Sequence, residues 1–158
     1  MSVPEILKAC PLFYEMFESE ISLVIEHCKI YQYNRGEYVL RQGDTGEEIY
    51  VLLEGKTSVE RVTDAGRVSI QTLESGDVFG ELCIIGEKVR QADILTMDVC
   101  AVLEITYENI FYLFQKKPRV FSIIMLNIAR LLTKRLSSSN QIIVNLYEKL
   151  KNLETMKP

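Results

Sequence analysis

The glycines of this 158-residue chain are confined to one part of the sequence. All eight lie between residues 36 and 86, whereas the four prolines lie outside that window. In this part of the chain, turn-forming residues recur about every ten residues. Between and beside these turns lie short runs with strand character, at residues 30–33, 38–41, 49–53, 57–62, 68–73, 92–97 and 99–105. The pattern predicts a fold that is mainly β, a sandwich or barrel of short strands.

The two ends of the chain have helical patterns instead. Apolar residues between positions 21 and 28 are spaced as on one face of a helix. Pro118 suits the first turn of another helix, and residues 119–153 contain neither proline nor glycine. A helix of that length would extend about 50 Å at ~1.5 Å per residue.

The last part of that helix carries a narrow apolar seam. Its members alternate in steps of three and four residues, as in a coiled coil: Leu136, Ser139, Ile143, Leu146, Leu150 and Leu153. One interpretation is that the helix packs along its own sheet. The other is that it pairs with the same helix of a second chain. A small β domain cannot cover about 50 Å of helix, so we favour a homodimer through the C-terminal helix.

Composition argues against several classes of protein. Uninterrupted apolar stretches are far shorter than the roughly 20 residues that a membrane helix needs, and the N-terminus lacks the basic start of a signal peptide. The four cysteines form no Cys-x-x-Cys pair, so we expect them to be reduced and the protein to be cytoplasmic. A metal-dependent cupin needs several histidines, and the chain has only His27. We therefore expect no metal and, without an evident nucleophile and base, no enzyme.

Charge is distributed unevenly along the chain. Residues 1–105 hold 9 Lys or Arg against 19 Asp or Glu, whereas residues 106–158 hold 9 against 3. An acidic body repels phosphates, which argues against general nucleic-acid binding. The nearest acidic partner for the basic C-terminal segment is the body of the same chain.

One segment, residues 76–92 (GDVFGELCIIGEKVRQA), has the features of an anion site. Gly80 ends a short predicted strand and precedes one helical turn, so backbone N–H groups there can point at an anion. Arg90 returns from the far end of the loop, and a guanidinium can bind a phosphate through two parallel hydrogen bonds. Glu81 adds an acceptor, which suits a sugar hydroxyl. Taken alone, the pattern also fits a turn with a surface ion pair.

This segment resembles the phosphate-binding cassette of the cyclic-nucleotide-binding domain family, which includes catabolite activator protein and the regulatory subunits of cAMP-dependent protein kinase. Three further segments resemble the family's opening helix and turn, its Gly-Asp turn with the strand before it, and the strand that follows. They are LKACPLF (7–13), NRGEYVLRQGD (34–44) and IYVLLEG (49–55). The resemblance therefore covers nearly the whole chain.

The resemblance implies a single domain with three parts. N-terminal helices would occupy residues 1–28 and a jelly-roll β-barrel residues 29–105. The family's B and C helices would occupy residues 106–158.

The resemblance also implies contacts with cAMP or cGMP, residue by residue. Glu81 would accept a hydrogen bond from the ribose 2′-hydroxyl, and Arg90 would pair with the cyclic phosphate. Gly80 would permit a close backbone approach. Backbone N–H groups or side chains would complete the site at Leu82, Cys83, Gln91 and Ala92. Ser139 and Asn140 resemble a pair that some dimeric members place over the adenine, although Ser139 also fits the seam as a residue that sets helix register.

Three positions depart from the family pattern. Val89 stands where the family often has proline before the arginine, which affects only the rigidity of the loop. Gln91 stands where a small or hydroxyl residue is usual, which leaves the choice between cAMP and cGMP open. Asp93 stands where Thr or Ser is common. Strand alternation places Asp93 on the face opposite Ala92, away from the phosphate.

These observations predict a regulatory module that binds a cyclic nucleotide, cAMP before cGMP, and transmits binding through its C-terminal helix to an unidentified downstream protein. Two alternatives remain. One is a degenerate domain that binds no nucleotide and serves as a dimerisation scaffold, and the other is a truncated transcription regulator of the catabolite activator type. The chain ends five residues after Leu153, which leaves no space for a helix-turn-helix, so unless it is truncated we expect this chain not to bind DNA. Its short apolar stretches give no reason to expect a membrane partner.

Overall fold

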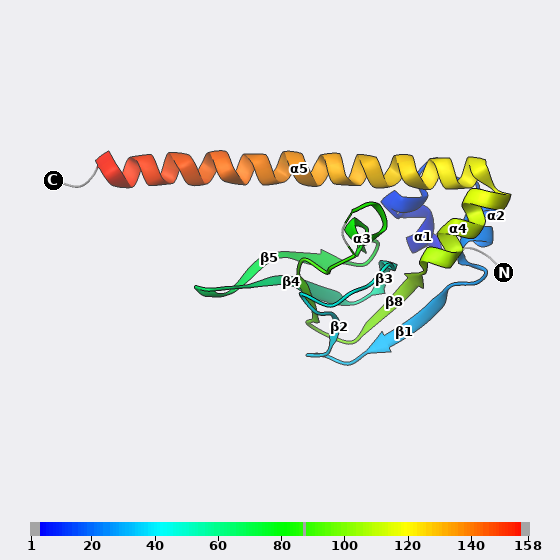
Figure 1. The fold of residues 1–158 in the computed structure, drawn as a ribbon. Helices are drawn as coiled ribbons and strands as arrows, with labels where there is room; N and C mark the ends of the chain where they lie inside the picture. Colours follow the sequence, from blue (N-terminus) through cyan, green and yellow to red (C-terminus); the bar gives the residue numbers. More distant parts are fainter. Residues whose placement is uncertain (1–3, 87, 156–158) are drawn as a thin grey trace.

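The strands of the computed structural model, which describes residues 4–86 and 88–155, form two four-stranded sheets (Figure 1). The first has the order β1 (Lys29–Tyr33), β8 (Cys100–Ile105), β3 (Ile49–Glu54) and β6 (Val78–Phe79). The second has the order β2 (Tyr38–Leu40), β7 (Asp93–Thr96), β4 (Lys56–Thr63) and β5 (Gly66–Glu74). Neighbouring strands are antiparallel throughout.

The predicted fold class is confirmed in part. Antiparallel sheets and a long C-terminal helix are present, and each predicted strand lies within about two residues of an observed one. The fold is mixed rather than mainly β, because α5 (Pro118–Thr155) alone has 38 residues. In the described part of the chain, the ladders form two separate sheets and not one closed barrel.

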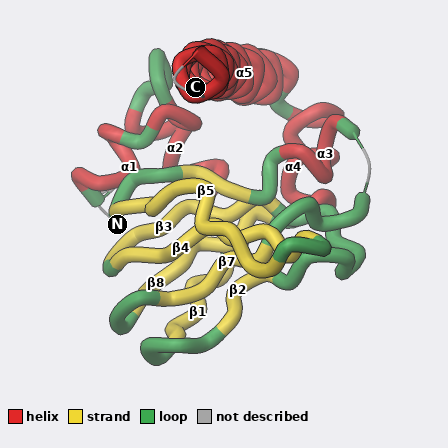
Figure 2. The backbone as a smooth tube through the Cα atoms, turned by 90° about the vertical axis from the view of Figure 1, so that its left-hand side faces the viewer, coloured by secondary structure: helices red, strands yellow, loops and turns green. Residues whose placement is uncertain are grey.

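The helices lie together on one side of the strands, with α5 seen end-on in Figure 2. The chain begins with α1 (Glu5–Ala9), a 3₁₀ turn η1 (Pro11–Phe13) and α2 (Glu18–Ile25). After the sheets come α4 (Tyr107–Lys116) and α5, whose first residue is Pro118, as predicted. Thr106 caps α4: its hydroxyl accepts from the N–H of Asn109, whose side chain accepts from the Thr106 N–H.

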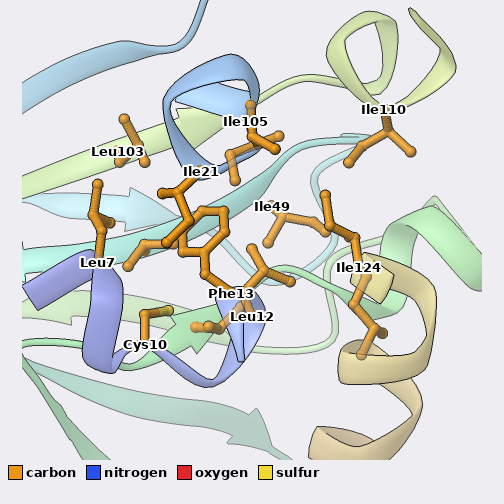
Figure 3. Close-up of a cluster of buried hydrophobic side chains, with 14 of the residues drawn as sticks. Leu7, Cys10, Leu12, Phe13, Ile21, Ile49, Leu103, Ile105, Ile110 and Ile124 are labelled. Carbon is orange, nitrogen blue, oxygen red and sulfur yellow. The ribbon is translucent and has the colours of Figure 1, made fainter. Parts of the chain in front are cut away.

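Two apolar clusters hold these layers together. The larger joins the helices to the first sheet (Figure 3) and includes Leu7, Phe13, Ile49, Ile105 and Ile124. The smaller lies between the two sheets and consists of Tyr50, Leu52, Leu73, Phe79, Ile94, Cys100 and Val102. Because Ile124 is completely buried in the larger cluster, the first part of α5 is fixed to the body of the domain.

Ion pairs reinforce this attachment. Three join basic residues of α5 to acidic residues nearer the N-terminus: Arg119–Glu20, Arg130–Glu15 and Arg135–Glu81. The prediction that the basic segment contacts the acidic body of its own chain is therefore confirmed.

Beyond Arg135, α5 extends past the helices that it packs against (Figure 1). The apolar seam residues Leu136, Ile143, Leu146, Leu150 and Leu153 are 54–63% exposed. The interpretation in which this half of the helix packs on its own sheet is therefore wrong. Within residues 4–86 and 88–155, no helix is both long and apolar enough to span a membrane.

Candidate functional site

A cavity of about 120 Å³ lies between the second sheet, α3 (Leu82–Ile85) and the Arg135 side chain of α5. All seven cassette residues predicted as ligand contacts line this cavity: Gly80, Glu81, Leu82, Cys83, Arg90, Gln91 and Ala92. Apolar side chains of the second sheet complete the wall, among them Leu40, Val59, Leu73 and Ile94. The cavity thus combines a charged end with an apolar lining.

Gly80 is required by both its backbone and its surroundings. Its φ of +81° lies in the left-handed region, which side chains disfavour. A Cβ at this position would lie 2.7 Å from the carbonyl oxygen of Glu48 and 2.8 Å from Nη1 of Arg90. The close approach expected at Gly80 is therefore made to the protein's own Glu48 and Arg90.

Arg90 is held in one orientation inside the protein and is only 4% exposed. Its Nη1 donates to the carbonyl oxygens of Glu48 at 3.0 Å and Gly80 at 3.2 Å. Its Nη2 donates to the carboxylate of Glu48 at 2.6 Å. A guanidinium fixed in this way is preorganised, because little side-chain entropy remains to be lost when a ligand binds.

Tyr50 lies beside this guanidinium, which is 5.7 Å from the centre of its ring. Burial is the main cause that raises the pKa of Tyr50, and the nearby Glu104 and Glu48 carboxylates add to it. The phenol therefore stays neutral at physiological pH and places no negative charge beside Arg90.

Glu81 is the second buried charge of the cavity, with 2% exposure. Its carboxylate accepts a hydrogen bond from Arg135 on α5, and Arg135 also donates to the carbonyl of Val78. The sequence reasoning missed Arg135, although it lines the cavity. The available signal was weak: a basic residue on the predicted helix, four positions before Ser139.

Ser139 and Asn140 are not brought to the cavity. Both are exposed on α5, about one turn beyond Arg135, where the helix leaves the body. Their predicted contact with a base stays a prediction, whereas Arg135 does reach the cassette, through the Glu81 carboxylate.

The turn that opens α3 uses its own N–H groups. The N–H of Cys83, predicted to face the ligand, donates to the carbonyl of Gly80 at 3.3 Å. The N–H of Ile84 donates to the carbonyl of Glu81 at 3.2 Å. Cys83 nevertheless remains in the cavity wall, as a buried free thiol.

Gln91 and Asp93, two of the departures from the family pattern, lie in different places. Gln91 is exposed, and its side-chain amide donates to the carbonyl of Val89 at 3.3 Å. Asp93 is buried but does not line the cavity. As strand alternation predicts, its carboxylate points elsewhere, to Gln42 and Arg67. In the described ranges, no group of three or more His, Cys, Asp or Glu residues could hold a metal ion.

Comparison with known proteins identifies the family of this chain. The family model described as "Cyclic nucleotide-binding domain" matches residues 30–133, most of the sequence. The chain belongs to the cyclic nucleotide-binding domain family. The matched range contains nearly all of both sheets, the cassette and α5 as far as Thr133.

Individual relatives support this assignment. The domain is 27% identical over 135 residues to the Cyclic AMP receptor protein of Thermus thermophilus, which covers 85% of this chain and 61% of the relative. It is 28% identical over 103 residues to human cGMP-dependent protein kinase 2, which covers 62% of this chain and 14% of the kinase. The chain thus spans less than two thirds of the length of either relative.

A solved structure supports the fold. The cyclic nucleotide-binding domain from Methylobacillus flagellatus superposes with a TM-score of 0.82 and 20% identity, covering 89% of this chain and 82% of that one. At this level of identity the likeness concerns the fold alone.

Proposed function

We propose that this domain binds a cyclic purine mononucleotide, cAMP before cGMP, in the cavity lined by its cassette. One observation carries the proposal: a buried arginine and a buried glutamate, Arg90 and Glu81, line the same cavity. A cyclic nucleotide offers an anionic phosphate for the guanidinium and a ribose hydroxyl for the carboxylate. Inorganic phosphate offers only the first and would be repelled by Glu81.

Each part of the cavity has a role in this proposal. Arg90 binds the cyclic phosphate from the orientation that Glu48 and Gly80 impose on it. The apolar lining contributed by Leu73 and Ile94 accepts the less polar parts of the nucleotide. The relatives include a cyclic AMP receptor protein and a cGMP-dependent protein kinase, so titration with both nucleotides decides the preferred base.

Arg135 supports a route by which binding reaches the C-terminal helix. A ribose hydroxyl that donates to Glu81 competes with Arg135 for the same carboxylate. Binding then weakens the contact between α5 and the cassette. A ligand shifts such an equilibrium only if it binds the two arrangements with different affinity, and competition for Glu81 supplies that difference. In this way the domain acts as a cytoplasmic regulatory module, not an enzyme, for a downstream protein.

The exposed seam supports a second part of the proposal, a homodimer through the C-terminal half of α5. Five large apolar side chains in coiled-coil spacing are solvent-exposed in the single chain. Ile143→Glu places a charge in the seam, whereas Gln141→Glu places the same charge two residues away, outside the seam. Light scattering at micromolar concentration should show a dimer for the wild type and Gln141→Glu, and a monomer for Ile143→Glu. A monomeric wild type would contradict the dimer.

Titration calorimetry tests the ligand. We expect cAMP and cGMP to bind and 5′-AMP to bind much more weakly, because it lacks the cyclic ester. Arg90→Lys keeps the charge but loses the two-pronged donor geometry, so affinity should fall by about tenfold or more. Thermal melting checks that the variant is folded. A folded wild type that gives no heat with either cyclic nucleotide would refute the proposal and favour a non-binding scaffold.

A further inference from the structure

A buried carboxylate lies directly behind the cavity but takes no part in its lining. Asp93 is 5% exposed and follows Ala92, which does line the cavity. Its Oδ1 accepts from the backbone N–H of Gln42 at 2.7 Å, and its Oδ2 accepts from Nη1 of Arg67 at 2.6 Å. Burying a carboxylate costs free energy unless it is paired and hydrogen-bonded. The groups that satisfy Asp93 therefore have to stay in place.

Residues 43–46 form a turn directly after Gln42. This turn lies alongside the cassette backbone and is hydrogen-bonded to it at Lys88 and Arg90. The N–H of Gly43 donates to the carbonyl of Arg90 at 2.9 Å, and the N–H of Arg90 donates to the carbonyl of Asp44 at 2.8 Å. The N–H of Gly46 donates to the carbonyl of Lys88 at 2.9 Å. The position of turn 43–46 therefore decides where the backbone of Arg90 lies.

The same turn also controls the Arg90 side chain. A Cβ on Gly46 would collide with the guanidinium, so the turn is in close contact with it. Two residues later, Glu48 accepts from the guanidinium through its carboxylate and its carbonyl. A shift of the turn would move the Arg90 backbone, the surface against its guanidinium and the Glu48 acceptors together.

Gln42 anchors the start of this turn at two points. Its backbone N–H is bound to Asp93. Its side-chain amide exchanges two hydrogen bonds with the backbone of Val62 on β4, at 2.8 and 3.2 Å. Arg67 on β5 balances the charge of Asp93 and also donates to Glu60 at 3.0 Å. Asp93 thus joins β7, the turn and the β4–β5 hairpin.

We propose that Asp93 is a positioning residue for the phosphate-binding arginine: it holds turn 43–46 against the cassette through Gln42, with Arg67 as its counterion. This inference rests on the proposed function, because it concerns the orientation of Arg90 toward a ligand. Asp93 itself does not contact the ligand. Since the phosphate is common to all cyclic nucleotides, loss of Asp93 lowers the affinities for cAMP and cGMP by the same factor.

Three variants and one matched control test the proposal. Asp93→Ala removes both hydrogen bonds, Asp93→Asn keeps an oxygen that can accept from Gln42, and Arg67→Ala removes the counterion. Glu74→Ala is the control, because it breaks an exposed ion pair with Lys56 on the same hairpin, away from the turn. Two quantities are measured: the dissociation constants of cAMP and cGMP, and the hydrogen-exchange rates of the Gly43 and Arg90 amides.

For Asp93→Ala we expect both nucleotides to bind about tenfold more weakly or worse, with an unchanged cAMP-to-cGMP ratio. The Gly43 and Arg90 amides should exchange about tenfold faster or more, whereas core amides of β3 should not change. Asp93→Asn should recover most of the affinity, Arg67→Ala should lie between the two, and Glu74→Ala should match the wild type.

Wild-type affinity and wild-type exchange in Asp93→Ala would overturn the proposal, as would an altered cAMP-to-cGMP ratio, which would place the effect at the base. If Asp93→Ala does not fold, Asp93→Asn and Arg67→Ala decide, and wild-type exchange and affinity in both would overturn it. If the wild type binds neither nucleotide, the proposed function fails by itself. The exchange rates of Gly43 and Arg90 then still show whether Asp93 positions the turn.

Discussion

Replacing Gly80 by alanine separates two costs that the structure places at one residue. The first is conformational, because φ is +81° and the left-handed region costs an L-residue about 1–2 kcal/mol. The second is steric, because the new Cβ would lie 2.7 Å from the Glu48 carbonyl oxygen, 2.8 Å from Nη1 of Arg90 and 3.2 Å from the Tyr50 ring. These neighbours are a backbone atom and two buried side chains, so they cannot easily move away. Overpacking of this kind costs roughly 1–3 kcal/mol.

Gly36→Ala is the matched control for this prediction. Gly36 has a φ of +85°, but a Cβ there would meet no heavy atom within 4 Å. The free energy of unfolding should therefore fall only by the conformational cost, about 1–2 kcal/mol, in Gly36→Ala. In Gly80→Ala it should fall by about 2–5 kcal/mol. The difference between the two variants isolates the contact with Glu48 and Arg90.

Urea unfolding with linear extrapolation measures both free energies of unfolding. The Gly80→Ala loss should exceed the Gly36→Ala loss by at least about 1 kcal/mol. Calorimetry should show in addition that only Gly80→Ala binds cyclic nucleotide more weakly, because only that Cβ displaces the guanidinium. Equal losses of stability in the two variants, or unchanged affinity in Gly80→Ala, would refute the reasoning.

Three further predictions concern stability and reactivity. Glu81→Gln and Arg135→Ala should be non-additive in a double-mutant cycle followed by urea unfolding, with a coupling of about 0.5–3 kcal/mol; additive losses would mean that the contact between cassette and α5 is weak. The Asn127 amide donates to the Leu12 and Tyr14 carbonyls at 3.0 and 2.7 Å. Asn127→Ala should therefore lower the free energy of unfolding by about 1–3 kcal/mol for each buried carbonyl that is left unpaired. Asn145→Ala, at an exposed position of the same helix, is the control. Burial raises the pKa of the Cys10 thiol to about 11 and that of Cys28 to about 12. Because only the thiolate reacts, iodoacetamide at pH 8 should label both cysteines only after unfolding, and mass spectrometry detects the label. The unfolded thiols ionise first, so stability should fall as the pH rises above about 9.

Local features of the chain predicted the helices and strands well, whereas the resemblance to the family identified the cassette. Glycines and turn residues mark where strands end, and a proline marks where α5 begins, because these residues act on their own backbone or their neighbours'. The convergence of Glu81 and Arg90 was also predictable, since both belong to one short loop. The orientation of Asp93 followed from the alternation of side chains along a single strand.

Contacts between distant segments were not predictable in this way. Glu48 holds Arg90 from 42 positions earlier, and Arg135 reaches Glu81 from 54 positions later. Neither contact leaves a periodic signal in the sequence. The resemblance to the family pointed instead to Ser139 and Asn140, which the observed course of α5 leaves exposed.

The sequence by itself determined the succession of strands and helices along the chain and the residues of the cassette loop, because these depend on interactions within a few positions of the chain. The ordered set of motifs in the sequence also identified the family. Only the tertiary structure decided which helix residue lines the cavity and which carboxylate pairs with Arg90. Those choices depend on how α5 and the turn after β2 pack against the sheets. Packing is a collective property of many distant residues, and no local pattern specifies it.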